Sequence, residues 1–274
     1  MINLLKADFF RVLRTKIVYI SLIIAVALPL FIALINGLTA MAVSSVYTEE
    51  DIAITGVGDT LIGNTFSPVM SFSYIFAVFP VIVIMMDFGN GTLRNKIIHG
   101  YTRHQIYAAH FIVSLVHIVA ITLLFVATSV VSALVLGISK VPAELVATFV
   151  SYYLVGFLSV VMVASLGSCL ALSLGNAGAI VITVIGTLFL NYLGSIIGLI
   201  LQLNKVTNME HLLCFFPSYF TENILAPSIL NLAYGADIPH IEAMYIVEAV
   251  AGVLLLSGGF YALGTFIFSK RDFK

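Results

Sequence analysis

Charged residues are scarce in this chain. Only 9% of its 274 residues are Asp, Glu, Lys or Arg, whereas 61% are hydrophobic. Soluble domains carry about 25% charged residues, so a water-soluble fold of this length would lack the polar side chains to cover its surface. The formal net charge of −1 also gives no indication of a basic surface for nucleic-acid binding, so no nucleic-acid partner is expected. The composition therefore predicts a protein embedded in a lipid bilayer.

Residues for catalysis and cofactor binding are equally sparse. Cys169 and Cys214 are the only cysteines, and their spacing suggests neither a disulfide framework nor a metal site. The chain contains no G-x-x-x-x-G-K-[ST] loop to cradle nucleotide phosphates and no H-E-x-x-H motif. We therefore expect no catalytic residue, no metal and no cofactor in this chain. An intramembrane enzyme is a poor fit to the same observations.

Long runs without charge define the expected architecture. The run from Leu145 to Asn204 would form a helix roughly 90 Å long, so it must fold back, and Leu174-Gly175-Asn176-Ala177-Gly178 has the composition of a turn. The first apolar run, from Ile17 to Ile35, is longer than the apolar region of a signal peptide, which has about 7–15 residues. We therefore expect it to be a retained helix. We expect an all-α polytopic membrane protein, with one transmembrane domain over residues 1–274. Its six spans are expected near residues 17–36, 67–86, 106–137, 148–174, 178–202 and 241–268.

The distribution of lysine and arginine predicts the orientation. With six spans, ten of the twelve Lys and Arg residues fall on the side that holds both termini, and only Lys140 and Lys205 fall on the other. Most acidic residues lie on the side opposite to the termini. Cytoplasmic loops carry the excess of basic residues, so we expect a multi-pass cell-membrane protein with both termini in the cytoplasm.

Two stretches outside the spans have their own patterns. In residues 1–16, Leu5, Phe9, Val12 and Leu13 recur at helical spacing, which predicts a helix in the cytoplasmic interface; a disordered basic tail is the alternative. Residues 205–240 contain apolar stretches, each of which is too short to cross the bilayer. This pattern predicts an outer reentrant segment between helices five and six.

The most informative loop covers residues 87–105. Gly89 and Gly91 permit a tight exit from the second span, Thr92 is expected to cap a short helix over residues 93–99, and Gly100 to end it. Such a short basic helix suits insertion into a groove on a soluble partner. A solvated positive-inside loop fits the residues equally well.

This loop resembles the one between the second and third helices of ABC type-2 permeases. The resemblance rests on Gly91-Thr92-Leu93, on Gly100-x-x-Arg103 and on Gln105-Ile106-Tyr107. Asp87 stands four residues before the Gly-Thr pair, where such permeases usually have Glu, and His110 stands where Lys is usual. The expected layout, with an interfacial helix, six spans and an outer reentrant segment, is also similar to that of the family.

The resemblance implies a transport subunit of a bacterial exporter for peptides, drugs or lipid-like molecules. ATP and Mg²⁺ would be bound by two separate ABC ATPase subunits, and a second permease chain, identical or related, would complete the pathway. The loop would then be the coupling helix that docks on the ATPase. The implied ATPase-coupling residues are Asp87, Gly91, Thr92, Arg94, Lys96, His99, Gly100 and Arg103.

Glu248 is the only acid expected well inside a span. Gly252 and Gly259 follow on the same helical face, and small residues mark packing faces, so the carboxyl should point into protein. It could bind a cationic group, relay protons or form a polar packing network with Tyr245. An ion- or proton-coupled secondary transporter that uses Glu248 is the alternative function, although no inverted repeat is visible.

The remaining candidates are apolar or small residues within the spans. Phe72, Phe76 and Phe79 could line a pathway for an amphipathic substrate or pack in the core. Gly194-x-x-x-Gly198 is a close-packing motif that could mark the interface between two permeases. His110 and His117 share a helical face, but without a nearby third ligand they are expected to be hydrogen-bonded packing residues.

Overall fold

The computed structural model describes residues 1–46, 73–135, 146–203, 213, 216 and 243–271, and this part of the chain is helical without strands. The all-α prediction is therefore confirmed for the described residues. Their helices are α1 (Ile2–Leu13), α2 (Lys16–Val46), α6 (Ser73–Gly89), α7 (Thr92–Ile98), α8 (Arg103–Val135), α9 (Val146–Leu174), α10 (Gly178–Leu203) and α14 (Ala243–Lys270).

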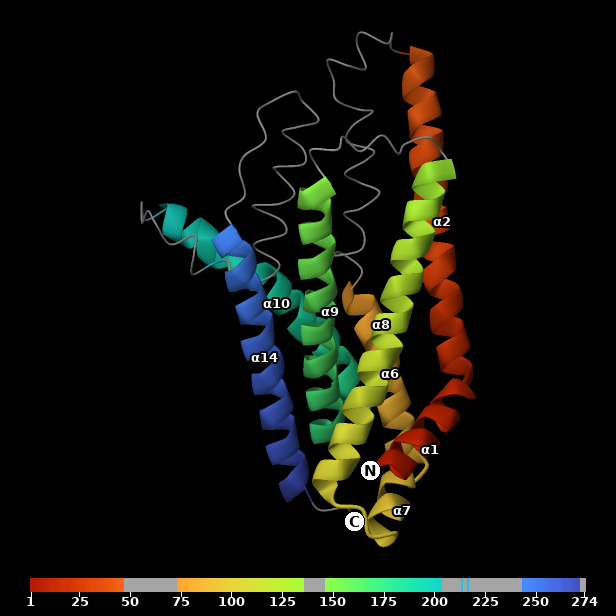
Figure 1. Cartoon of the computed structure of the whole chain (residues 1–274), viewed down its shortest axis with the longest axis vertical. Helices are drawn as coiled ribbons and strands as arrows, with labels where there is room; N and C mark the ends of the chain where they lie inside the picture. Colours follow the sequence, from red (N-terminus) through yellow and green to blue (C-terminus); the bar gives the residue numbers. More distant parts are fainter. Residues whose placement is uncertain (47–72, 136–145, 204–212, 214–215, 217–242, 272–274) are drawn as a thin grey trace.

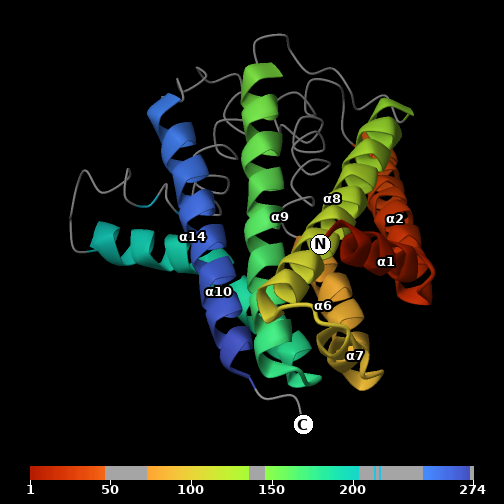
Figure 2. The same ribbon diagram turned by 60° about the horizontal axis from the view of Figure 1, so that its bottom comes forward.

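The long helices form an elongated bundle. Helices α2, α6, α8, α9 and α14 run along its length, whereas α10 is steeply inclined to them (Figures 1 and 2). Helix α9 packs against α6, α8, α10 and α14, so it forms the centre of the bundle. Helices α1 and α7 lie at the same end as the last turn of α14 (Figure 1). We call this the α7 end.

Four helices are long and apolar enough to cross a membrane within the described residues. These candidate spans are Lys16–Ile35, Arg103–Ser132, Leu154–Leu174 and Ala243–Lys270; the apolar stretches Val78–Gly89 and Gly178–Leu190 are shorter. In hydrocarbon a helix satisfies its own backbone groups, so apolar runs of this length take helical form.

The turn predicted between the fourth and fifth expected spans is present. Helix α9 ends at Leu174, and Gly175 follows with φ of +62°, a conformation that glycine adopts without the strain of a Cβ atom. Helix α10 begins at Gly178, where the sequence places its start. Arg271 donates hydrogen bonds to the carbonyl oxygens of Leu172, Ser173 and Leu174. These carbonyls at the end of α9 would otherwise lack partners, so the arginine ties α14 to α9.

Helix α1 lies across the bundle axis at the α7 end (Figure 2). Leu5, Phe9 and Val12 contribute to a cluster with residues of α2, α6 and α8. The predicted apolar face was wrong in one residue, because Leu13 is 58% exposed. Asp8 is buried in the same helix, which shifts the inward face toward the position of a charged residue.

Several predictions fall on residues outside this description. Apart from Leu213 and Phe216, the outer reentrant segment 205–240 lies outside the described residues, and so do Phe72 and the start of the span expected from residue 67. They stay predictions.

Candidate functional site

The predicted loop helix is α7, and its two flanking glycines explain its length. Gly91, with φ of +66°, is the residue before its first turn, and Thr92 is the first helical residue. The prediction that the Thr92 side chain caps the helix was wrong, since no side-chain hydrogen bond caps it. At the other end Gly100 has φ of +85°, and its N–H donates to Ile97 O at 2.9 Å while Tyr101 N–H donates to Lys96 O at 3.2 Å. This pair of bonds is a Schellman motif, so Gly100 ends the helix as predicted.

Helix α7 has an inward and an outward face. Leu93 is 2% exposed and anchors the inward face, together with Lys96. We define the outward face as Arg94, Asn95, Ile98 and His99, whose side chains are all exposed. Ile98 is 70% exposed even though it is apolar. Helix α7 is therefore held on one side and exposed on the other within the described part of the chain.

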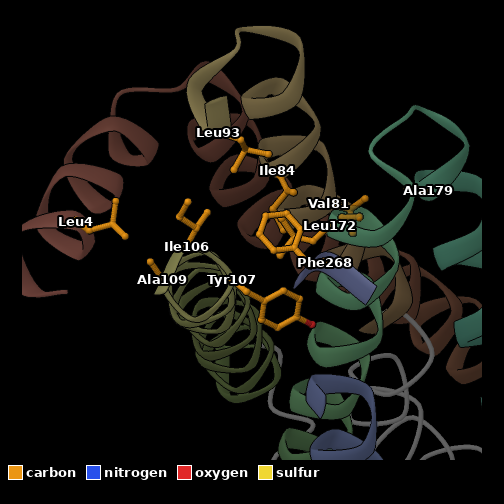
Figure 3. Packing of buried hydrophobic residues seen from close by; sticks show 11 residues of the cluster. Leu4, Val81, Ile84, Leu93, Ile106, Tyr107, Ala109, Leu172, Ala179 and Phe268 are labelled. Atoms are coloured by element: carbon orange, nitrogen blue, oxygen red, sulfur yellow. The ribbon is translucent and has the colours of Figure 1, made fainter. Parts of the chain in front are cut away.

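The inward face of α7 rests on an apolar cluster. Leu93 belongs to one buried cluster with Ile84 of α6, Ile106 and Tyr107 of α8 and Phe268 of α14 (Figure 3). Tyr107 is fully buried, and its ring meets the Tyr261 ring edge-on at a centroid distance of 5.3 Å. The cluster therefore connects α7 to the helices that form the bundle.

Ionisable side chains lie beside this cluster, and all of them except that of Arg11 are buried. Lys96 Nζ lies 2.7 Å from Asp8 Oδ1 and 3.0 Å from His110 Nε2. Arg11 pairs with Asp87 and lies 3.4 Å from Asp8 Oδ1, and His110 Nδ1 lies 3.5 Å from Asp87 Oδ2. The side chains of both aspartates and of His110 are at most 5% exposed. We call these five residues, which come from α1, α6, α7 and α8, the charged junction.

The junction is balanced in charge. Two carboxylates lie opposite one lysine and one arginine, and of these four side chains only that of Arg11 is partly exposed, at 31%. Burial lowers the pKa of Lys96 from its ordinary value of 10.5, and the Asp8 carboxylate opposes that shift. The close contact with Asp8 compensates the loss of water around the ammonium group.

The structure divides the predicted ATPase-coupling residues into groups. Arg94 and His99 belong to the outward face, and His99 Nδ1 lies 2.7 Å from the carbonyl oxygen of Asn95. Asp87 and Lys96 belong to the charged junction. Arg103 donates a 2.6 Å hydrogen bond to the carbonyl oxygen of Ser269, at the last turn of α14.

Glu248 is buried in α14, as predicted from its neighbour Gly252, which is also buried. The expected continuation of that face was wrong, because Gly259 is exposed. The packing face instead follows Ala249, Val253 and Gly264. Tyr245 lies one turn before Glu248 and is half-buried.

The aromatic and small-residue candidates have structural positions. Phe76 is buried and meets Phe125 edge-on at a centroid distance of 5.3 Å, in the central core that Phe79 also contacts. These contacts indicate core packing for both. Gly194 and Gly198 lie on α10, and Gly198 is buried within this chain. His117 has a hydrogen-bonding partner in Ser21 Oγ at 2.9 Å, which is the packing role expected of it.

A cavity of about 590 Å³ lies between α2 and α8. Its lining is apolar except for two hydroxyl residues, Thr128 and Ser132, which donate to carbonyl oxygens of their own helix. The lining consists of Leu30, Ala33, Leu34, Gly37, Leu38, Ala127, Thr128, Val131, Ser132 and Val135. We call this cavity the apolar groove; its size is typical of ligand pockets.

Three residues with clear contacts were missed by the sequence interpretation: Asp8, Arg11 and Arg271. Asp8 carried a signal, because it is the only acid before Glu49 and lies in a segment of basic residues. Arg11 is three residues from Asp8 and thus on the same helical side. For Arg271, the sequence shows only that the residue follows the last expected span, which does not indicate its hydrogen bonds to α9.

These observations define a class: a polytopic helical membrane protein with a short, half-exposed helix anchored at one end of its bundle. The sequence from residue 4 to 194 matches the family described as ABC-2 family transporter protein, a stretch that includes most of α1 and continues into α10. The chain therefore belongs to the ABC-2 transporter family. No curated protein matches the chain significantly.

Family membership establishes the coarse function. The chain is the permease subunit of an ABC transporter and a multi-pass membrane protein. Permease subunits of this family generally have no ATP site of their own, and they work with ABC ATPase subunits and a permease partner.

Proposed function

We propose that this chain is the permease of an ATP-driven exporter in a bacterial cell membrane, and that α7 is the helix that docks on a separate ATPase. Two ATPase subunits, with their ATP and Mg²⁺, would serve two permease chains. The substrate would be an amphipathic peptide, a drug or a lipid-like molecule. In this proposal the chain crosses the membrane six times and both termini are cytoplasmic.

The outward face of α7 is the observation that carries this proposal. A helix of seven residues has little stability by itself, yet Leu93 and the charged junction hold it in one place. Its exposed side combines the cation of Arg94 with the apolar side chain of Ile98. A protein interface typically combines an apolar centre with a polar rim, and this face has both.

The positions of basic residues support the proposed orientation. Lys6, Arg14, Arg94 and Lys270 are exposed, and their helices place them at or near the α7 end (Figure 1). Lysine and arginine concentrate on the cytoplasmic side of membrane proteins, which is also the side where ATP is available.

The apolar groove supports an apolar or amphipathic substrate. It lies along two candidate spans, and its hydroxyl groups already donate within their own helix, so its walls offer mainly hydrocarbon contacts. The alternative of a secondary transporter that uses Glu248 finds less support, because family membership favours coupling to ATP.

The docking proposal is tested by changing the outward face alone. The chain is purified together with its cognate ABC ATPase, and the bound ATPase is quantified. Ile98→Asp places a charge at the centre of the proposed contact, so we expect at least about a tenfold loss of bound ATPase, as for a hot-spot residue. Arg94→Glu should also weaken binding.

Lys6→Glu is the matched control, since Lys6 is an exposed cation on α1 outside the outward face. It should leave the bound ATPase unchanged. If Ile98→Asp retains the ATPase as well as Lys6→Glu does, α7 is not the docking helix. The export direction is tested in inverted membrane vesicles, which should accumulate an amphipathic dye only when ATP is added.

A further inference from the structure

Lys96 lies on the short helix that we propose as the docking element, yet it does not face outward. Its side chain is 9% exposed, and its ammonium group contacts Asp8, which is 88 residues away in the sequence. Arg94, two residues earlier, is exposed. One of the two cations of α7 is thus turned into the protein.

A lysine is a costly way to fill this position if packing is its only purpose. Both charges lose their water, and an apolar side chain of similar volume often stabilises a buried site as well as an ion pair does. An ion pair has directional contacts that an apolar side chain lacks. It therefore favours one register of two helices over the neighbouring ones.

Helix α1 is tied at two points, to α7 itself and to the end of α6 that precedes it. Asp8 binds Lys96 within α7, and Arg11 binds Asp87, which precedes α7 at the end of α6. Asp8 and Arg11 are one helical turn apart, so both reach inward from the same side of α1. His110 lies between Lys96 and Asp87 and adds α8 to the same group.

We propose that Asp8 and Lys96 are positioning residues for ATPase coupling, which fix α7 to α1 in the register that the ATPase recognises. Helix α1 is then part of the coupling element although Asp8 has no exposed surface to offer a partner. This inference rests on the proposed docking role of α7.

The test measures how much ATPase subunit is needed for activity. Permease variants are reconstituted in nanodiscs, and the fraction of folded protein is normalised by gel filtration. The cognate ABC ATPase is then titrated while ATP hydrolysis is followed. Asp8→Asn and Lys96→Met should each raise the half-maximal ATPase concentration about tenfold, which corresponds to about 1.4 kcal/mol of binding free energy. The maximal rate should stay unchanged.

Two further variants separate positioning from simple stability. Lys96→Arg keeps the charge and should restore much of the affinity, whereas the double variant Asp8→Asn with Lys96→Met should be no weaker than either single variant. Ser21→Ala is the control, because it removes a buried hydrogen bond between α2 and α8, to His117, outside the charged junction. It should lower the thermal unfolding temperature without changing the half-maximal concentration.

The inference and the docking proposal fail in different ways. If Ile98→Asp weakens binding and Asp8→Asn does not, α7 docks without help from α1 and the inference is overturned. If Asp8→Asn weakens binding and Ile98→Asp does not, the linkage stands and the outward face is the wrong docking surface. If neither variant changes the half-maximal concentration, both are overturned.

Discussion

At the α7 end, five ionisable side chains from four helices are packed together, whereas further along α2 and α8 the same bundle holds a cavity of about 590 Å³. The first region has fully buried residues such as Ile106 and Tyr107, and its contacts connect α1, α6, α7, α8 and α14. In the second region, small residues such as Ala33 and Gly37 line the cavity. The comparison indicates that the close packing at the α7 end does not extend to the space between α2 and α8.

The strongest test of this comparison adds one methyl group at the closely packed end. A Cβ atom at Gly264 would overlap the Tyr107 hydroxyl and lie 3.0 Å from the Cys169 Cα atom, which belongs to the backbone and cannot rotate away. We expect Gly264→Ala to lower the free energy of unfolding by about 3 kcal/mol, at the upper end of overpacking effects. Thermal unfolding of the purified protein in detergent measures the change.

Gly259→Ala is the control on the same helix, because a Cβ atom there has no neighbour within 4 Å. It should keep or slightly raise the unfolding temperature, as alanine is a better helix former than glycine by up to about 1 kcal/mol. Equal destabilisation by both variants would contradict the tight packing of α14 against α8 and α9.

A second test compares one substitution at two sites of α8. Ala109 is fully buried in the cluster at the α7 end, and Ala127 is exposed and lines the apolar groove. Ala109→Leu should destabilise the protein by about 2 kcal/mol, since the cluster has no space for three more carbon atoms. Ala127→Leu should change stability by less than about 0.5 kcal/mol, because the groove accommodates the added group.

Both changes are measured by thermal unfolding under the same conditions. The comparison between the two regions fails if the two leucine variants unfold at the same temperature. A larger loss at Ala127 than at Ala109 would show that the groove is a packed surface.

The smallest expected effect concerns the hydroxyl group of Tyr107. This buried oxygen has no hydrogen-bonding partner within the described part of the chain. Removing an unsatisfied buried polar group is neutral or favourable, so Tyr107→Phe should raise the free energy of unfolding by up to about 1 kcal/mol. Tyr261→Phe, on the half-buried ring that contacts Tyr107, should have no effect. A lower unfolding temperature for Tyr107→Phe would show that its hydroxyl is bound in the protein.

Much of the fold could be predicted because the relevant signals are local. The charge-free runs predict the all-α class, the residues Leu174 to Gly178 predict the turn between α9 and α10, and Gly100 predicts the end of α7. Each rests on a few neighbouring residues and on the cost of polar groups in hydrocarbon. The family resemblance is likewise carried by the short loop pattern that begins at Gly91.

The charged junction could not be predicted in the same way. Lys96 in a positive loop is normally a solvated cation, and its pairing with Asp8 depends on a contact between residues far apart in sequence. The side of α14 that packs was also set by tertiary contacts. A Cβ atom at Gly264 would overlap Tyr107, whereas one at Gly259 would have no neighbour within 4 Å. Spacing alone identified Gly252 and missed this difference.

The two faces of α7 have a consequence for how a permease of this kind could be matched to another ATPase subunit. Leu93 and Lys96 hold the helix, while Arg94, Asn95, Ile98 and His99 contribute little to its attachment. If the outward face selects the ATPase, these four positions can be exchanged as a set without disturbing the fold. A permease could then be matched to a different ATPase subunit by exchanging these four side chains. The same four positions could keep related permease–ATPase pairs in one cell from mixing.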